Sequence, residues 1–343
     1  MTVRVAINGY GTIGKRVADA VSLQDDMRVA GIVKTSPSFE LDLAQQRKFP
    51  IYANTKENMA LLQQKGISVQ GTTEDLLDQA DIVIDGTPSK IGKENKEKLY
   101  IPRKIKAILQ GGEKAPTVEC SFNASNNYQQ SYGKNYVRVV SCNTTGLSRS
   151  LGAIKKALGI TSARVTLIRR AADPFDDETG PINAIAPDPI TIPSHHGPDV
   201  KTIIPDLDIV TMAVIVPTTL MHLHTLNIQL PKTTTAQEIK DLFAKTPRIL
   251  VVESDKRISS TASIMEMARD LCRPRGDLQE LAVWDKSISV VNGNELFFTQ
   301  AVHQESIVVP DNIDCIRAMM QLTDDPLTSM KKTDQSLGLK KWW

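Results

Sequence analysis

Short apolar runs alternate with segments of helical periodicity through the first part of the chain. Five runs are predominantly apolar: 3–7, 29–33, 82–84, 107–109 and 137–140. After the first and last of them, apolar residues recur every three to four positions, in 13–21 and 147–158. Strands without polar alternation are typical of a parallel sheet that helices cover on both faces. The pattern predicts a Rossmann-type α/β domain.

The pattern changes near residue 160. Three long segments, 163–170, 209–216 and 221–230, are rich in β-branched residues and largely alternate. Asn292-Gly293 lies between two further strand-like segments, a spacing typical of a hairpin turn. We therefore expect an α+β second domain with a largely antiparallel mixed sheet. A helix that starts at Pro310-Asp311 follows it.

The composition of the chain argues against several classes of protein. The 343 residues carry 41 Lys and Arg against 39 Asp and Glu, a net charge of +2 that gives no strong field for nucleic acid. No apolar run reaches the ~18 residues of a membrane span, so we expect a cytoplasmic protein without a membrane partner. The four cysteines are far apart, which indicates neither a disulfide framework nor a metal site.

The loop after the first strand has the spacing Gly9-x-Gly11-x-x-Gly14. Between a strand and a helix, this spacing permits a tight turn, a close approach to a pyrophosphate and close helix packing. We interpret it as a dinucleotide-binding loop, against the alternative of a plain turn. Lys34 ends the second strand where NAD-specific sites have a carboxylate, so it either accommodates the 2′-phosphate of NADP or is an ordinary exposed lysine.

Cys142 follows an apolar strand and precedes a helix. The positive end of a helix lowers the pKa of a thiol and favours the nucleophilic thiolate. A buried, inert cysteine is the alternative, and we accept it for the other three. The end of a parallel strand is where α/β folds place their chemistry, which favours a reactive Cys142.

All five histidines lie in the second half of the chain. His222 and His224 share one face of a predicted strand with apolar residues, as either a catalytic base or hydrogen-bonded core histidines. Arg169-Arg170 and His195-His196 are candidate anion donors, with surface positions as the alternative. Adjacent arginines on a strand face opposite ways, so the two would serve different partners.

Four motifs together resemble one family. They are Asn8-Gly-Tyr-Gly-Thr-Ile-Gly14, Ser141-Cys-Asn-Thr-Thr145, Pro193-Ser-His-His-Gly-Pro-Asp199 and Ala301-Val-His-Gln-Glu305. The chain is similar over almost its whole length to the archaeal-type phosphorylating glyceraldehyde-3-phosphate dehydrogenases. The resemblance implies a homotetramer whose chain has a dinucleotide-binding domain, 1–141 and 304–343, and a catalytic domain, 142–303.

The resemblance also implies a reaction and its residues. Glyceraldehyde 3-phosphate and inorganic phosphate would give 1,3-bisphosphoglycerate through a thiohemiacetal and a thioester, with NADP or NAD as cofactor. Cys142 would be the nucleophile and His222 the general base, with His224 structural. The implied substrate and phosphate ligands are Ser141, Asn143, Arg169, His195 and His196. The implied cofactor contacts are Gly9, Gly11, Thr12, Ile13, Gly14, Lys34, Gly111, Arg170 and Gln304.

Three other functions fit the same loop and cysteine less well. A semialdehyde dehydrogenase shares the architecture but not the His-His-Gly-Pro-Asp segment. A non-phosphorylating aldehyde dehydrogenase needs no second anion site. A non-catalytic NAD(P)-binding protein would have no use for Cys142.

Overall fold

A computed structural model describes residues 2–110, 112–172, 180–181 and 183–339. The chain forms two compact units, 2–141 with 309–339, and 142–308, and each is described by itself. The boundary expected after residue 303 falls after residue 308. The reason is that Arg149 donates to the carbonyl of Ile307 and Ser306 to that of Leu278, which ties 304–308 to the second unit.

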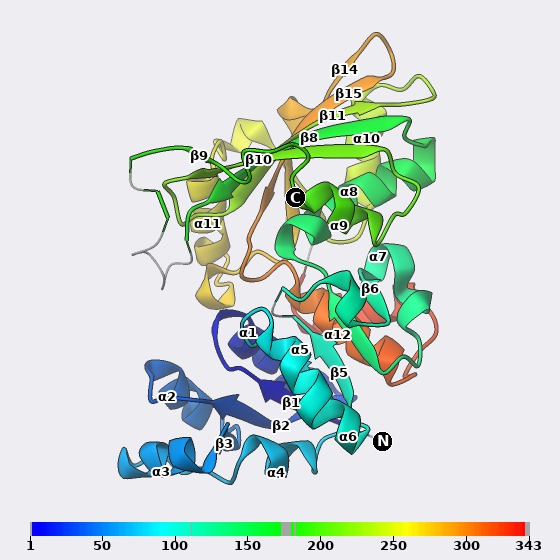
Figure 1. The fold of residues 1–343 in the computed structure, drawn as a ribbon. Helices are drawn as coiled ribbons and strands as arrows, with labels where there is room; N and C mark the ends of the chain where they lie inside the picture. Colours follow the sequence, from blue (N-terminus) through cyan, green and yellow to red (C-terminus); the bar gives the residue numbers. More distant parts are fainter. Residues whose placement is uncertain (1, 111, 173–179, 182, 340–343) are drawn as a thin grey trace. The chain divides into compact units, whose positions relative to one another are not determined.

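The first unit contains a seven-stranded parallel sheet in the order β3-β2-β1-β4-β5-β7-β6 (Figure 1). The five predicted strands are β1 (Val3–Asn8), β2 (Met27–Lys34), β4 (Ile82–Asp85), β5 (Lys106–Leu109) and β7 (Tyr136–Val139). Two more strands, β3 (Ile51–Ala53) and β6 (Cys120–Phe122), lie at the edges. Each has three residues, too few to produce a recognisable pattern.

Helices surround this sheet. They are α1 (Thr12–Ser22), α2 (Phe39–Gln46), α3 (Lys56–Gln64), α4 (Thr73–Leu77), α5 (Ile91–Asn95), α6 (Ile101–Arg103), α7 (Ala124–Asn127), α12 (Val309–Met319) and α13 (Pro326–Ser336). Every residue of α12 is buried. Arg317 of this helix donates to Gln24 at 2.6 Å and to Asp26 at 2.8 Å, just after α1. The segment 309–339 is therefore an integral part of the first unit.

The second unit contains an eight-stranded mixed sheet in the order β12-β13-β15-β11-β8-β10-β9, with β14 paired to β15. The strands are β8 (Ser162–Arg170), β9 (Ala186–Pro187), β10 (Ile209–Val216), β11 (His222–Gln229), β12 (Ile249–Val252), β13 (Leu281–Trp284), β14 (Ser289–Val291) and β15 (Glu295–Val302). Two pairs, β8–β10 and β12–β13, are parallel and the others antiparallel. Asn292 and Gly293 both have positive φ, as the predicted hairpin turn requires.

The polar residues of interest lie on one face of this sheet, and apolar core residues pack on both faces. Helices α8 (Cys142–Leu158), α9 (His196–Lys201) and α10 (Ala236–Lys245) lie on one side of it in Figure 1, and α11 (Thr261–Asp270) packs on the other. Along β11, His222, His224, Leu226 and Ile228 are buried, as the alternation predicts. A Cβ on Gly146 of α8 would come within 2.6 Å of Val302 on β15. The start of α8 therefore lies close against this face.

None of the helices in the described ranges is long and apolar enough to cross a bilayer.

Candidate active site

The glycine loop of the first unit has the geometry of a phosphate-binding turn. Gly9 has a φ of +95°, and a Cβ on Gly14 would lie 1.9 Å from the carbonyl oxygen of Gly9. A Cβ on Gly11 would meet nothing within 4 Å, so the backbone is open there. Gly11 is also the N-cap of α1, which leaves the N–H groups at Thr12 and Ile13 without a side-chain cap. This open helix start fits the pyrophosphate of a dinucleotide.

Lys34 has a carboxylate partner that the sequence pattern did not reveal. Its Nζ lies 3.3 Å from Oε2 of Glu40 and 3.3 Å from the carbonyl oxygen of Tyr10. Buried Lys15 lies 3.8 Å from the other oxygen of Glu40. Burial raises the pKa of Glu40, but hydrogen bonding from Ser38 and the charge of Lys34 lower it overall. Lys34 is therefore part of an ion-pair cluster. Gly111, the other predicted cofactor contact near this sheet, lies outside the described residues.

Cys142 is the first residue of α8 and is half-buried. Burial raises the pKa of its thiol to about 11, whereas the charges of Arg169 and Arg170 and the backbone N–H of Asn143 lower it. The expected net lowering at the helix start is therefore not found. Desolvation of a thiolate is the larger effect here, and the two arginines offset only part of it. Ser141 precedes the cysteine and is exposed.

Asn143 links two histidines on different elements. Its Oδ1 lies 2.9 Å from Nε2 of His224 on β11, and its Nδ2 lies 3.4 Å from Nε2 of His196 on α9. Nδ1 of His224 in turn lies 3.0 Å from the side-chain amide of Gln300 on β15. The amide orientation of Asn143 is therefore set by both neighbours. The structural role of His224 stays a prediction.

His196 makes contacts through both ring nitrogens, which the sequence did not predict. Its Nδ1 lies 3.1 Å from Oγ of Ser194, which is 2.8 Å from Oγ1 of Thr211 on β10. Both ring nitrogens thus have protein partners, and burial lowers the pKa of His196 to about 2. In this arrangement His196 has no nitrogen left for a phosphate. The ring centroid of His195 lies 3.9 Å from that of His196, and His195 is exposed, so it is the more accessible of the two.

The two arginines at the end of β8 face opposite sides of the sheet, as predicted. The register that pairs Leu223 with Ile168 puts Arg169 beside His222. The guanidinium of Arg169 forms an ion pair with Asp188, which follows β9. A phosphate at Arg169 would therefore share the guanidinium with Asp188 or replace it.

The side chain of Arg170 binds several groups of its own unit. Its Nε donates to Oε1 of Gln304 at 2.6 Å, and a terminal nitrogen donates to the carbonyl of Ala172 at 3.0 Å and pairs with Glu305 at 3.0 Å. Oε2 of Glu305 lies 3.0 Å from Nε2 of His303. Arg170 was expected to contact the cofactor. In this arrangement it positions Gln304 by donating to its side-chain oxygen, and this bond does not use the side-chain N–H groups of Gln304.

His222 is held through one ring nitrogen only. The backbone N–H of Arg170 donates to its Nδ1 at 3.0 Å. Its Nε2 is buried and has no hydrogen-bond partner in the part of the chain that the structure describes. Burial, together with the charges of neighbouring histidines and arginines, lowers the pKa of His222 well below its ordinary value.

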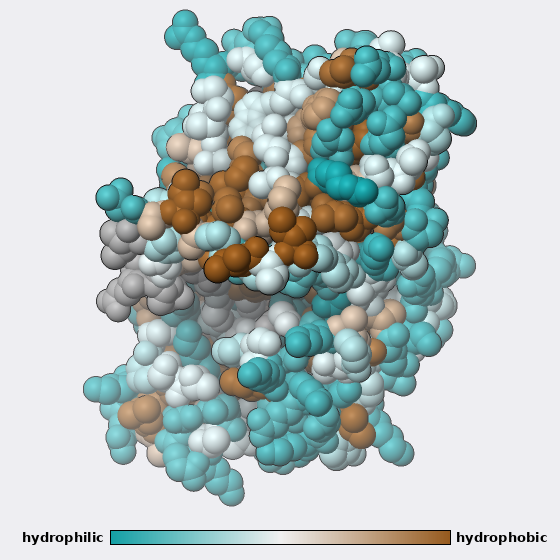
Figure 2. Space-filling model, turned by 45° about the horizontal axis from the view of Figure 1, so that its top comes forward, coloured by the Kyte–Doolittle hydropathy of each residue, from teal (hydrophilic) through white to brown (hydrophobic). Residues whose placement is uncertain are grey.

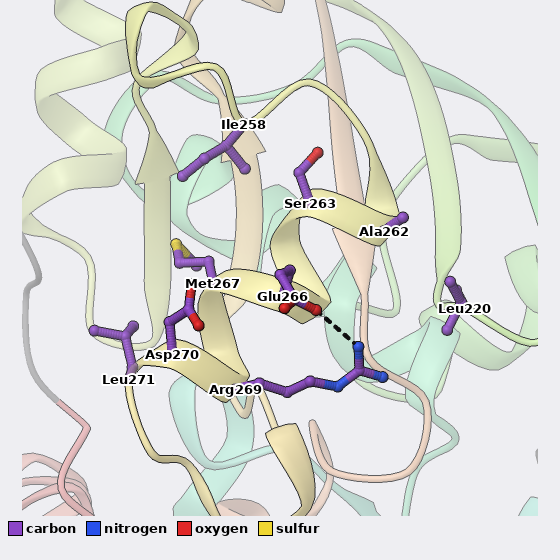
Figure 3. A pocket seen from close by; sticks show the side chains of 9 residues that line it. All are labelled: Leu220, Ile258, Ala262, Ser263, Glu266, Met267, Arg269, Asp270 and Leu271. Atoms are coloured by element: carbon purple, nitrogen blue, oxygen red, sulfur yellow. Dashed lines mark hydrogen bonds and ion pairs between the residues drawn. The ribbon is translucent and has the colours of Figure 1, made fainter.

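A hollow along α11 of the second unit contains none of these residues (Figure 3). Leu220, Ile258, Met267 and Leu271 line it together with Ala262, Ser263, Glu266, Arg269 and Asp270. Glu266 and Arg269 pair with each other at 3.0 Å, as the dashed line shows. The described residues also contain no group of three side chains arranged to hold a metal ion. This hollow therefore does not include the polar residues around Cys142.

A dinucleotide loop in one unit and a cysteine close to arginines in the other fit an oxidoreductase that uses a nicotinamide dinucleotide. Residues 141–287 match the family model of the glyceraldehyde 3-phosphate dehydrogenase C-terminal domain, and residues 3–109 match that of the dihydrodipicolinate reductase N-terminus.

Relatives of known name cover almost the whole chain. Glyceraldehyde-3-phosphate dehydrogenase of Methanocaldococcus jannaschii is 54% identical over 344 residues, 99% of this chain and 100% of the relative. The enzyme of the same name from Archaeoglobus fulgidus is 54% identical over 99% of both chains. That of Methanococcoides burtonii is 54% identical over 98% of this chain and 99% of its own. The chain belongs to the glyceraldehyde-3-phosphate dehydrogenase family, and its cofactor is NAD or NADP.

Proposed function

We propose that this protein oxidises glyceraldehyde 3-phosphate and transfers the product to inorganic phosphate, giving 1,3-bisphosphoglycerate. The observation that carries the proposal is Cys142 at the start of α8, with Arg169 and Arg170 lowering the pKa of its thiol against burial. The sulfur attacks the aldehyde carbon to give a thiohemiacetal, and oxidation gives a thioester. A phosphate oxygen then attacks the thioester carbon, and the Cys142 sulfur leaves.

The cofactor supplies the oxidant, because oxidised nicotinamide accepts a hydride from carbon. The open backbone at Gly11 and the start of α1 would hold its pyrophosphate. In the second unit, Gln304 would present its side-chain amide, held in place by Arg170.

The test is the initial rate of NADP and NAD reduction with glyceraldehyde 3-phosphate, with and without phosphate, before and after iodoacetate treatment. We expect a phosphate-dependent rate that alkylation abolishes. A full rate without phosphate or arsenate would indicate the non-phosphorylating reaction instead. No rate with either cofactor would point to another aldehyde, as in a semialdehyde dehydrogenase, or to a binding role.

Arg169 and His195 are the proposed anion ligands, with Ser141 and Asn143 beside the substrate. Replacing Arg169 by Ala removes a guanidinium that would bind a phosphate oxygen pair. We expect KM for phosphate or for glyceraldehyde 3-phosphate to rise by about 10-fold or more, since a hydrogen bond to a charged group contributes about 1.5–3 kcal/mol. Steady-state kinetics with each substrate varied in turn decides which anion is affected. Unchanged KM values for both would remove Arg169 from the site.

Lys34 is proposed to favour NADP through the 2′-phosphate. In Lys34→Asp the new carboxylate would lie near Glu40 and repel that phosphate, so the NADP to NAD ratio of kcat/KM should fall by about 10-fold or more. Glu40→Gln is the matched variant, because it removes the carboxylate that now pairs with Lys34 and should raise the same ratio. A ratio that neither substitution changes would contradict the role of Lys34.

The chain is proposed to form a homotetramer, with the exposed apolar surface of the second unit as an interface. Ile185, Ile190 and Ile192 are 68%, 83% and 62% exposed in the segments flanking β9, and Met212 on β10 is exposed as well. Figure 2 shows brown, apolar side chains gathered over one region of the surface. Exposed apolar patches of this kind are typical of interfaces. Light scattering should give the mass of four chains, and Ile190→Asp should lower it.

A further inference from the structure

We infer that the buried side chains of Asp85 and Tyr100 are positioning residues for the cofactor. They hold the loop 86–88, which follows β4, against the glycine loop that follows β1. This role concerns the binding of NAD or NADP by the first unit, so it does not depend on the reaction proposed for Cys142.

The carboxyl ends of β1 and β4 are the place where this sheet is expected to bind its ligand. The strand order reverses there, because β2 and β3 follow β1 on one side while β4 and β5 lie on the other. Open α/β sheets bind ligands at such a switch point. Asn8 ends β1 and Asp85 ends β4, and the two residues are paired across the sheet. Both therefore lie next to the expected cofactor site.

The loop 86–88 packs directly on the glycine loop. The N–H of Gly86 donates to the carbonyl of Asn8 at 2.8 Å. A Cβ on Gly9 would lie 3.0 Å from the carbonyl carbon of Gly86 and 3.1 Å from the backbone nitrogen of Thr87. Because the two loops leave no room for a side chain between them, a shift of 86–88 would also shift the turn at Gly9.

Asp85 fixes the loop 86–88 through its carboxylate, which is 1% exposed. Its Oδ1 accepts hydrogen bonds from the backbone N–H of Thr87, at 2.9 Å, and from the hydroxyl of the same residue. Its Oδ2 accepts from the hydroxyl of Tyr100 at 2.6 Å and from the side-chain amide of Asn95 at 2.9 Å. Among the described residues, the partners of this buried carboxylate are therefore neutral donors, and two of them belong to the loop.

The hydroxyl of Tyr100 connects the ends of β1 and β4. It accepts a hydrogen bond from the side-chain amide of Asn8 at 2.8 Å and donates to Asp85. Burial and the charge of Asp85 raise the pKa of Tyr100 well above its ordinary value, so the phenol keeps the proton that it donates. One buried hydroxyl thus links the two strands whose following loops meet at Gly9 and Gly86.

The helical segment that carries Tyr100 contains an unusual turn. Between α5 and α6, in the cyan part of Figure 1, lies the π-helix η1 (Lys96–Tyr100). In an α-helix, residues five apart point about 140° away from each other. A π-turn closes between residues five apart, so Asn95 and Tyr100 can reach the same oxygen of Asp85. Such turns are rare and frequent at functional sites, which is a second observation that points to Asp85.

Tyr100→Phe tests the role, because it removes the hydroxyl and keeps the packing of the ring. We expect the Kd of oxidised NADP and that of oxidised NAD to rise by about 10-fold each, since the loop 86–88 loses part of its support. The two should rise equally, because the cluster does not include Lys34. Asp85→Asn should raise both at least as much, because it removes the charge that strengthens the four hydrogen bonds. Isothermal titration calorimetry of the full-length protein measures each Kd.

Tyr128→Phe is the matched control. Tyr128 is also buried in the first unit, and its hydroxyl donates to the carbonyl of Thr323 at 2.9 Å. Its ring packs on Phe122 of the edge strand β6, at the end of the sheet away from β1. We expect a comparable loss of thermal stability and an unchanged Kd. Kd values within about 2-fold of the wild type in Tyr100→Phe, or an equal rise in Tyr128→Phe, would overturn the inference.

Hydrogen exchange followed by mass spectrometry reports on the loop itself, without cofactor. We expect the amide hydrogens of 86–91 to exchange faster in Tyr100→Phe than in the wild type and in Tyr128→Phe. A raised Kd with unchanged exchange in this segment would contradict the positioning of the loop. Neither measurement requires turnover. If the wild type oxidises no glyceraldehyde 3-phosphate, the proposed function fails, while binding and exchange still decide the role of Asp85 and Tyr100.

Discussion

Replacing Cys142 by Ser is expected to lower kcat by about 10⁴-fold or more. The serine hydroxyl is far less acidic than a thiol, and burial at the start of α8 already disfavours an anion at this position. An oxygen ester would also transfer less readily to phosphate than a thioester. Steady-state assays with glyceraldehyde 3-phosphate, phosphate and either cofactor measure the loss.

The other cysteines provide controls for this result. Cys272 is exposed and Cys120 is partly exposed, and neither belongs to the polar cluster. Cys272→Ser and Cys120→Ser should keep kcat close to that of the wild type and should still be inactivated by iodoacetate. If Cys142→Ser keeps more than about one hundredth of the wild-type kcat, the covalent route through the sulfur is untenable.

Replacing Arg170 by Met should lower the free energy of unfolding by about 3–5 kcal/mol, because it leaves a buried carboxylate without its cation. The side chains of Arg170 and Glu305 are both buried and lie 3.0 Å apart. Arg164→Met on the same strand is the matched control, since its ion pair with Asp208 is about half exposed. That substitution should change stability by less than about 1 kcal/mol. Urea unfolding of all three proteins gives the comparison.

The carboxylate of Glu305 also makes the free energy of unfolding depend on pH in the acidic range. Burial opposes ionisation, but the hydrogen bond from His303 and the charge of Arg170 hold the pKa of Glu305 at about 2. A folded pKa below the ordinary 4.5 means that the ionised group stabilises the fold above pH 4.5. This contribution fades as the pH falls from 4.5 towards 2. Glu305→Gln should flatten that part of the unfolding profile, and an unchanged profile would contradict the assignment.

The fold was largely predictable because its main strands carry strong local patterns. The predominantly apolar run at β1 and the alternation along β11 each identify an element and its buried face. The edge strands β3 and β6 were missed because three residues cannot display a period. The domain boundary was displaced because hydrogen bonds from Arg149 and Ser306 hold the segment 304–308, and these are tertiary contacts.

The reactive groups of the site were easier to predict than their partners. Cys142 and the two strand histidines stand out through residue type and position. Glu40, Asp188 and Gln300 are ordinary polar residues in the sequence, and only the fold brings them to Lys34, Arg169 and His224. These partners decide which nitrogen carries a proton and which cation is free. For this reason the protein partners of His196 and Arg170 and the effect of burial on the pKa of Cys142 could not be derived from the sequence, and the roles of these residues and of His222 stay predictions.

The return of α12 to the first unit sets an order of events during synthesis. The second unit is one continuous segment, 142–308, whereas the first unit needs both 2–141 and 309–339. Its buried Arg317 reaches Gln24 and Asp26 only after the whole second unit has been made. On the ribosome, the catalytic unit can therefore complete its native contacts first. Until 309–339 has been made, the first unit exposes the surface that α12 covers in the folded protein. A chaperone that binds nascent chains would bind to this surface.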